Sequence, residues 1–103
     1  MQTPLQIVFR HADRSPALEA RVRDLVARLE HVHHHINACR VTVEGPPAHQ
    51  HKGSTYCVRI ALGVPGGEIN VSNDQHGPEQ ADVYVALRDA FEGAKRQLLS
   101  FAS

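Results

Sequence analysis

The tripeptide Pro65-Gly66-Gly67 separates two segments of the chain in which apolar and polar residues alternate. A period of two is typical of a β-strand with one buried face, and a Pro-Gly pair is a strong turn signal. Residues 49–71 therefore predict a loop followed by a β-hairpin, and they contain no catalytic arrangement. The apolar positions are Tyr56, Val58, Ile60 and Leu62 before the turn, and Ile69 and Val71 after it.

Two further strands and two helices are predicted around this hairpin. Residues 5–9 and 39–44 alternate in the same way, whereas the stretches after Ser15-Pro16 and after Asp82 have apolar residues three and four positions apart. That spacing is typical of an amphipathic helix, and Ser15 and Asp82 are suitable N-caps. The two stripes are Leu18, Val22, Leu25, Val26, Leu29 and Val32, and then Tyr84, Leu87, Phe91, Ala94, Leu98 and Phe101.

The resulting order is β-α-β-β-β-α, which predicts an α+β fold with a four-stranded mixed sheet. The first two strands should pair in parallel because a helix connects them, and the others should be antiparallel. Both helices have one apolar stripe, so we expect them on the same face of the sheet. The 103 residues fit a single domain, residues 1–103. The open face would present Val8, Arg40, Thr42, Arg59 and Asn70.

Charge and cysteine content narrow the class of protein. Eleven basic and eleven acidic residues give a formal net charge of zero, which argues against simple non-specific binding of nucleic acid.

Neither a signal peptide nor a membrane span is visible, so we expect a cytoplasmic protein with reduced thiols. Cys39 should lie on the helix-covered face of the sheet and Cys57 on the open face, an arrangement that disfavours a disulfide.

Six short motifs occur along the predicted elements. They are Arg10-His11, Ser15-Pro16-Ala17-Leu18, Ala27-Arg28-Leu29-Glu30, Pro65-Gly66-Gly67-Glu68, Asp82-Val83-Tyr84-Val85-Ala86-Leu87 and Lys95-Arg96-Gln97-Leu98. In this order they resemble the family of ribosome hibernation-promoting factors and ribosome-associated translation inhibitors, also described as sigma-54 modulation proteins. The resemblance extends from Leu5 to Phe101 and implies a dsRBD-like fold.

The resemblance implies a non-enzymatic stress-response and stationary-phase factor. It would bind the small ribosomal subunit through rRNA and occlude the channel for mRNA and tRNA, without a cofactor, a small-molecule substrate or a membrane. We expect a monomer. Because the chain ends at Ser103 without the dimerisation tail of long relatives, we do not expect it to dimerise ribosomes alone.

Basic residues are the candidate rRNA contacts. The alternative for each is a solvated surface residue in an ion pair, such as Arg88 with Glu92. Relatives are usually basic along both helices, whereas each helix here sums to zero charge and position 93 is Gly93. We therefore expect weaker rRNA binding. The candidates are Arg10, Arg14, Arg21, Arg28, Lys52, Arg88, Lys95 and Arg96.

Two functions of other classes stay open. A metal-binding protein would use His31, His35, His49 and His51, although no cysteine or glutamate is placed to complete a zinc site. A protein-interaction domain that kept the fold but lost rRNA binding would agree with the neutral helices. Tyr56 and Tyr84 lie on apolar stripes, so packing in the core is the favoured interpretation for both and stacking on RNA is the second. No catalytic motif or phosphate loop is present.

Overall fold

The computed structural model of the chain describes residues 4–32, 35–45, 56–73 and 82–102. Its element order confirms the β-α-β-β-β-α prediction. The strands are β1 (Leu5–Arg10), β2 (Ala38–Glu44), β3 (Cys57–Val64) and β4 (Gly67–Ser72), and the helices are α1 (Pro16–Val32) and α2 (Val83–Ala102). In the part of the chain so described, no helix is both long and apolar enough to cross a membrane.

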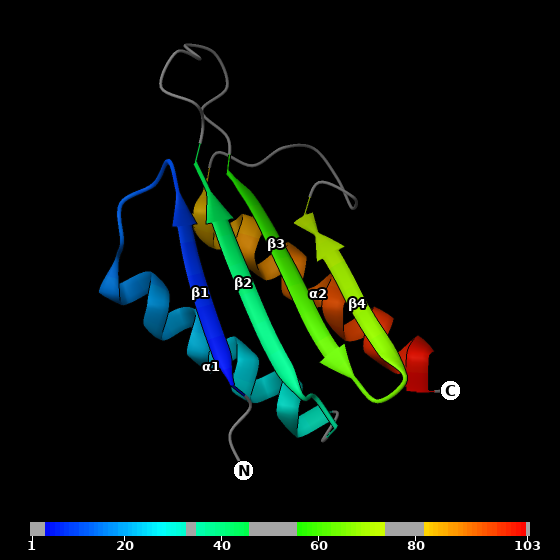
Figure 1. The fold of residues 1–103 in the computed structure, drawn as a ribbon. Helices are drawn as coiled ribbons and strands as arrows, with labels where there is room; N and C mark the ends of the chain where they lie inside the picture. Colours follow the sequence, from blue (N-terminus) through cyan, green and yellow to red (C-terminus); the bar gives the residue numbers. More distant parts are fainter. Residues whose placement is uncertain (1–3, 33–34, 46–55, 74–81, 103) are drawn as a thin grey trace.

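The strands lie in the order β1-β2-β3-β4, with both helices on one face of the sheet (Figure 1). β1 and β2 are parallel, with Ile7 beside Val41. β2–β3 and β3–β4 are antiparallel, with Val41 beside Ile60 and Ile60 beside Val71. One row of branched apolar side chains thus crosses the whole covered face, as the alternating pattern predicts.

Both predicted helix starts are confirmed. The Ser15 hydroxyl accepts a hydrogen bond from the Leu18 backbone N–H at 3.2 Å, and Pro16 begins α1. The Asp82 carboxylate accepts one from the Tyr84 N–H at 2.9 Å. Each cap satisfies a backbone donor that the first turn of a helix leaves without a partner.

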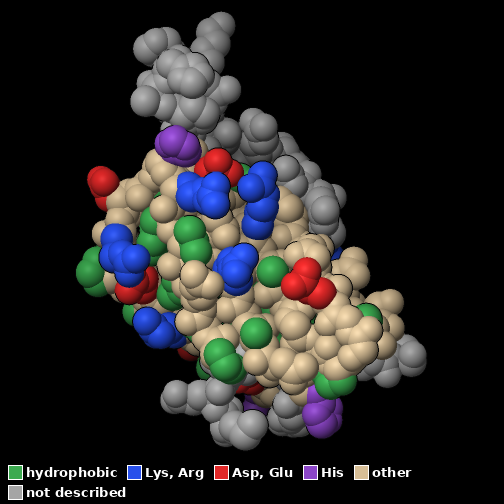
Figure 2. Space-filling view, viewed as in Figure 1, with side chains coloured by type: hydrophobic (Ala, Val, Ile, Leu, Met, Phe, Trp, Pro, Cys, Tyr) green, Lys and Arg blue, Asp and Glu red, His purple; other side chains and the backbone are tan. Residues whose placement is uncertain are grey.

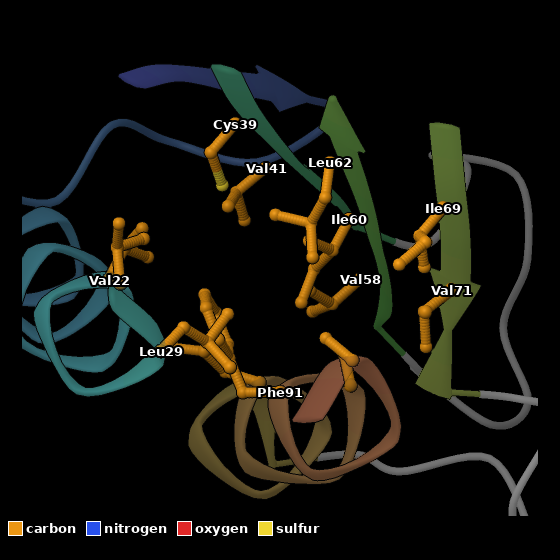
Figure 3. Packing of buried hydrophobic residues seen from close by; sticks show 14 of the residues in the cluster. Val22, Leu29, Cys39, Val41, Val58, Ile60, Leu62, Ile69, Val71 and Phe91 are labelled. Carbon is orange, nitrogen blue, oxygen red and sulfur yellow. The ribbon is translucent and has the colours of Figure 1, made fainter. Parts of the chain in front are cut away.

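The core lies between the sheet and the helices (Figure 3). Val41, Val58 and Leu62 of the strands and Leu87 and Leu98 of α2 are completely buried. Cys39 is also buried on this side, and both cysteines are free thiols, as predicted. Ala86, Ala90 and Ala94 repeat along α2 at one-turn intervals and are fully buried, so α2 can lie close to its neighbours.

Three residues of the predicted apolar helix stripes are exposed. Tyr84 and Phe101, which the sequence places in the core, are 45% and 46% exposed, and Val32 at the end of α1 is 41% exposed. The buried residues of α2 run from Ala86 to Leu98, and those of α1 from Leu18 to Leu29. Tyr84, Phe101 and Val32 lie outside these spans, in the first or last turn of their helices. The prediction was wrong at these positions because periodicity shows which face of a helix is apolar but not how far along the helix that face is covered.

One end of the sheet has two features that the sequence does not indicate. The Gly45 N–H donates to the Arg10 carbonyl at 2.8 Å and extends the β1–β2 pairing. A Cβ atom at Gly45 would overlap the His11 carbonyl oxygen, so only glycine fits there. His11 itself has a φ of 53°, which is the left-handed conformation.

Candidate nucleic-acid interface

A groove of about 370 Å³ lies between α1 and α2. Its apolar floor includes Leu25, Leu29, Val32 and Phe91. Arg21 and Arg28 line it from α1, Arg88 and Lys95 from α2, and Glu92 is its one acidic lining residue among the described positions. Four of the predicted rRNA contacts therefore come together in one place, although they are far apart in the sequence.

The helical repeat explains this convergence. Arg21 and Arg28 are seven residues apart, as are Arg88 and Lys95, and seven residues make almost two full turns of an α-helix. Each helix thus presents two cations on one side, separated by about 10 Å along its axis. Because α1 and α2 pack against each other, the two pairs line opposite sides of the groove.

Carboxylates offset part of this positive charge. Asp24 Oδ2 lies 3.1 Å from Arg21 Nη1 and 3.2 Å from Arg28 Nη2. Arg88 Nη2 pairs with Asp89 Oδ1 at 3.1 Å, rather than with Glu92 as the alternative interpretation of the sequence had it. Within the described residues Lys95 has no hydrogen bond or ion pair. Exposed pairs of this kind are weak, so the arginines can exchange partners with an incoming anion.

The other candidates do not line this groove. Arg14 pairs with Glu19 at 3.0 Å, and its guanidinium lies 5.7 Å from the centre of the Phe9 ring. Arg10 is exposed at the end of β1, and Arg96 is exposed on α2 next to Lys95. Lys52 is outside the described residues. The eight candidates are therefore not a single cluster.

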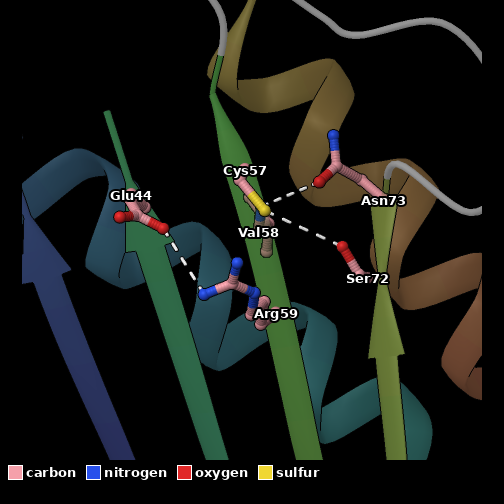
Figure 4. A network of polar contacts seen from close by, with 6 residues as sticks. All are labelled: Glu44, Cys57, Val58, Arg59, Ser72 and Asn73. Atoms are coloured by element: carbon pink, nitrogen blue, oxygen red, sulfur yellow. Dashed lines mark hydrogen bonds and ion pairs between the residues drawn. The ribbon is translucent and has the colours of Figure 1, made fainter. Parts of the chain in front are cut away.

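The open face of the sheet carries two more arginines that were not among the predicted contacts. Arg40 Nε donates to Gln6 Oε1 at 3.3 Å, and Arg59 Nη1 lies 3.4 Å from Glu44 Oε1 (Figure 4). Both line a hollow of about 350 Å³. Figure 2 looks onto this face and shows basic side chains interspersed with acidic ones. Strand alternation had already placed both arginines here, but it gives no reason to assign them a ligand.

The histidine hypothesis finds little support in the structure. His31 is exposed in the last turn of α1 and His35 is exposed after it. No three metal-ligating side chains are grouped together within residues 4–32, 35–45, 56–73 and 82–102. His49 and His51 lie outside these ranges, so their part in a metal site stays a prediction.

Cys39 is the one described group with a clearly shifted pKa. Burial, together with the negative charge of Glu30, raises the pKa of its thiol from 9.0 to about 12. The thiol therefore stays protonated at neutral pH and behaves as a small apolar side chain. This agrees with the packing role that the sequence suggested for it.

Comparison with known proteins gives both a family match and two similar structures. Residues 5–103 match the family model described as "Sigma 54 modulation protein / S30EA ribosomal protein". The N-terminal domain of Protein Y from Thermus thermophilus is similar, with a TM-score of 0.77 and 21% identity over 97% of this chain and 99% of that one.

The second structure is a ribosomal subunit interface protein from Coxiella burnetii, with a TM-score of 0.79 and 19% identity over 97% of this chain and 98% of that one. At these identities the two structures establish the fold alone. No curated protein sequence gives a significant match.

Proposed function

Since the chain belongs to the sigma 54 modulation protein / S30EA ribosomal protein family, we propose that it binds the small ribosomal subunit and acts as a hibernation factor. The observation that carries this proposal is the groove lined by Arg21, Arg28, Arg88 and Lys95. A similar fold in a protein described as a ribosomal subunit interface protein also supports it. The protein would act in the cytoplasm, as a monomer and as one domain.

The proposed contact is between the groove cations and rRNA phosphates. Arginine and lysine bind phosphate through charge-assisted hydrogen bonds, and these contacts position a protein on RNA without reading its sequence. Bound in the channel for mRNA and tRNA, the domain would exclude both by occupying their space. Inhibition by occlusion needs no covalent chemistry, so the protein would not be an enzyme.

Local charge, rather than net charge, would determine this binding. The chain is neutral overall, and the carboxylates that the structure shows paired with the groove cations or lining the groove are Asp24, Asp89 and Glu92. Four cations against three carboxylates leave a weakly positive surface. We therefore expect moderate affinity and strong weakening by salt, since each phosphate contact releases counterions.

Cosedimentation with purified small subunits tests the proposal. The wild type should pellet with the subunits at low salt and dissociate at high salt. The double variant Arg28→Gln/Lys95→Gln should bind at least about tenfold more weakly, with a salt slope reduced by about one for each lost contact. Free protein at low salt, with no subunit-bound fraction, would overturn the proposal and leave the protein-interaction alternative.

A matched control variant tests whether the groove cations or the total charge of the protein determines binding. Arg40→Gln/Arg59→Gln removes the same two positive charges from the open face of the sheet, on the side away from the helices. This variant should bind as the wild type does. Equal losses in both double variants would show that net charge, and not the groove, determines binding.

A displacement experiment tests the proposed position on the ribosome. Addition of mRNA and initiator tRNA should displace the wild type if it occupies their channel.

A further inference from the structure

Asp24 contacts both basic residues that α1 contributes to the groove. It lies three residues after Arg21 and four before Arg28, which places all three side chains on one side of the helix. The same oxygen, Oδ2, lies within 3.2 Å of a guanidinium nitrogen of each arginine. The Asp24 side chain is 49% exposed, so this pairing faces solvent and not the core.

Of the three carboxylates at the groove, Asp24 alone pairs with two of its cations among the described residues. Asp89 pairs with Arg88 alone, and Glu92 lines the groove without an ion pair within the described residues. Glu19 pairs with Arg14, outside the groove. Asp24 is therefore the acidic residue whose removal would release the most positive charge in the groove.

The contacts that Asp24 makes resemble those of a bound phosphate. Asp24 Oδ2 accepts a hydrogen bond from Arg21 and forms an ion pair with Arg28, and guanidinium groups bind the oxygens of phosphate as they bind those of carboxylate. We propose that Asp24 is an internal competitor for RNA, because its carboxylate takes the place of a phosphate between Arg21 and Arg28. This inference rests on the proposed function and concerns how tightly the same groove binds.

Competition of this kind limits affinity in a defined way. RNA must first displace the carboxylate from both arginines, and the displaced Asp24 then stays near the phosphate and repels it. Exposed ion pairs are weak, so the effect on the dissociation constant should be about two- to tenfold. Asp24 would thus lower the affinity of the groove for RNA. A lower affinity favours dissociation, which a factor that leaves the ribosome again requires.

The variant Asp24→Asn tests this inference, because asparagine has the same shape without the charge. We expect it to bind small subunits about two- to tenfold more tightly than the wild type, with a steeper salt dependence. Asp24→Glu keeps the carboxylate and should bind as the wild type does. Glu68→Gln is the charge-matched control, since it removes an exposed carboxylate from β4, on the open face of the sheet.

The outcomes separate the inference from the proposed function. If the wild type binds and Asp24→Asn binds equally or more weakly, Asp24 orients the arginines and the inference is wrong. If Glu68→Gln strengthens binding as much as Asp24→Asn, total charge is responsible and the inference is also wrong. If neither the wild type nor Asp24→Asn binds ribosomal subunits, the proposed function fails and the inference fails with it.

Discussion

The side-chain oxygen Oδ1 of Asn73 accepts a hydrogen bond from the backbone N–H of Val58 at 2.8 Å (Figure 4). Its Nδ2 atom donates to the carbonyl of Tyr56 at 3.3 Å. Asn73 is the one buried polar residue among the described positions, and it lies just after β4. A single side chain thus completes the backbone pairing at the start of β3.

Replacement of Asn73 by alanine should reduce the free energy of unfolding by about 1–3 kcal/mol, because it leaves a buried backbone N–H without an acceptor. Urea denaturation followed by circular dichroism measures the change. Asn70→Ala is the matched control, since Asn70 is exposed on β4 and its side chain donates a hydrogen bond to Glu68. A loss at Asn73 no larger than the loss at Asn70 would contradict this account.

Replacement of Gly45 by alanine should destabilise the fold by about 1–3 kcal/mol, because the added methyl group overlaps the His11 carbonyl. The chain offers a precise control at Gly63 in β3. A Cβ atom there would lie 3.7 Å from its nearest neighbours, which is ordinary contact. Gly63→Ala should therefore be neutral or slightly stabilising. Thermal unfolding of the two variants and the wild type measures both effects. Equal effects at the two glycines would contradict the proposed clash.

The stability that Cys39 contributes should fall at alkaline pH. Its pKa is about 12 in the folded state against 9.0 when solvated, so between these values the folded state holds a proton that the unfolded state has lost. The free energy of unfolding therefore decreases as pH rises above about 9, by an amount on the order of 1 kcal/mol per unit.

Comparison of the wild type with Cys39→Ala isolates this contribution. Alanine should cost about 1 kcal/mol at pH 7 through the lost packing, and that difference should shrink or reverse by pH 10. Cys57→Ala is the control, because Cys57 lies on the open face of the sheet. A difference between wild type and Cys39→Ala that does not change with pH would contradict the shifted pKa.

Lys95 and Arg96 are adjacent in sequence but should differ in function. Lys95 lines the groove and has no ion pair within the described residues, whereas Arg96 is exposed on α2 outside the groove. Lys95→Gln should weaken binding to small subunits several-fold and reduce the salt slope by about one. Arg96→Gln should change neither quantity appreciably. Filter binding at several salt concentrations measures both, and a larger effect at position 96 would place the interface elsewhere.

Local patterns in the sequence were sufficient to predict the strands, the helices and the buried face of each strand. Alternation around Ile60 and Val41 identified the buried face of each strand, because successive side chains of a strand point to opposite faces. Ser15 and Asp82 identified the helix starts, because capping depends on residues within one turn. The family resemblance from the ordered motifs is confirmed by the match over residues 5–103.

Only the tertiary structure decided which residues meet. Arg28 and Lys95 are 67 positions apart, and nothing local to either indicates that they share a groove, whereas Arg96 looked equivalent to Lys95. Tyr84 has the spacing of a core residue, but it lies in the first turn of α2 and is 45% exposed. The physical reason is the same in each case. Periodicity defines the faces of an element, whereas the packing of elements against one another determines how much of each face is covered and what lies beside it.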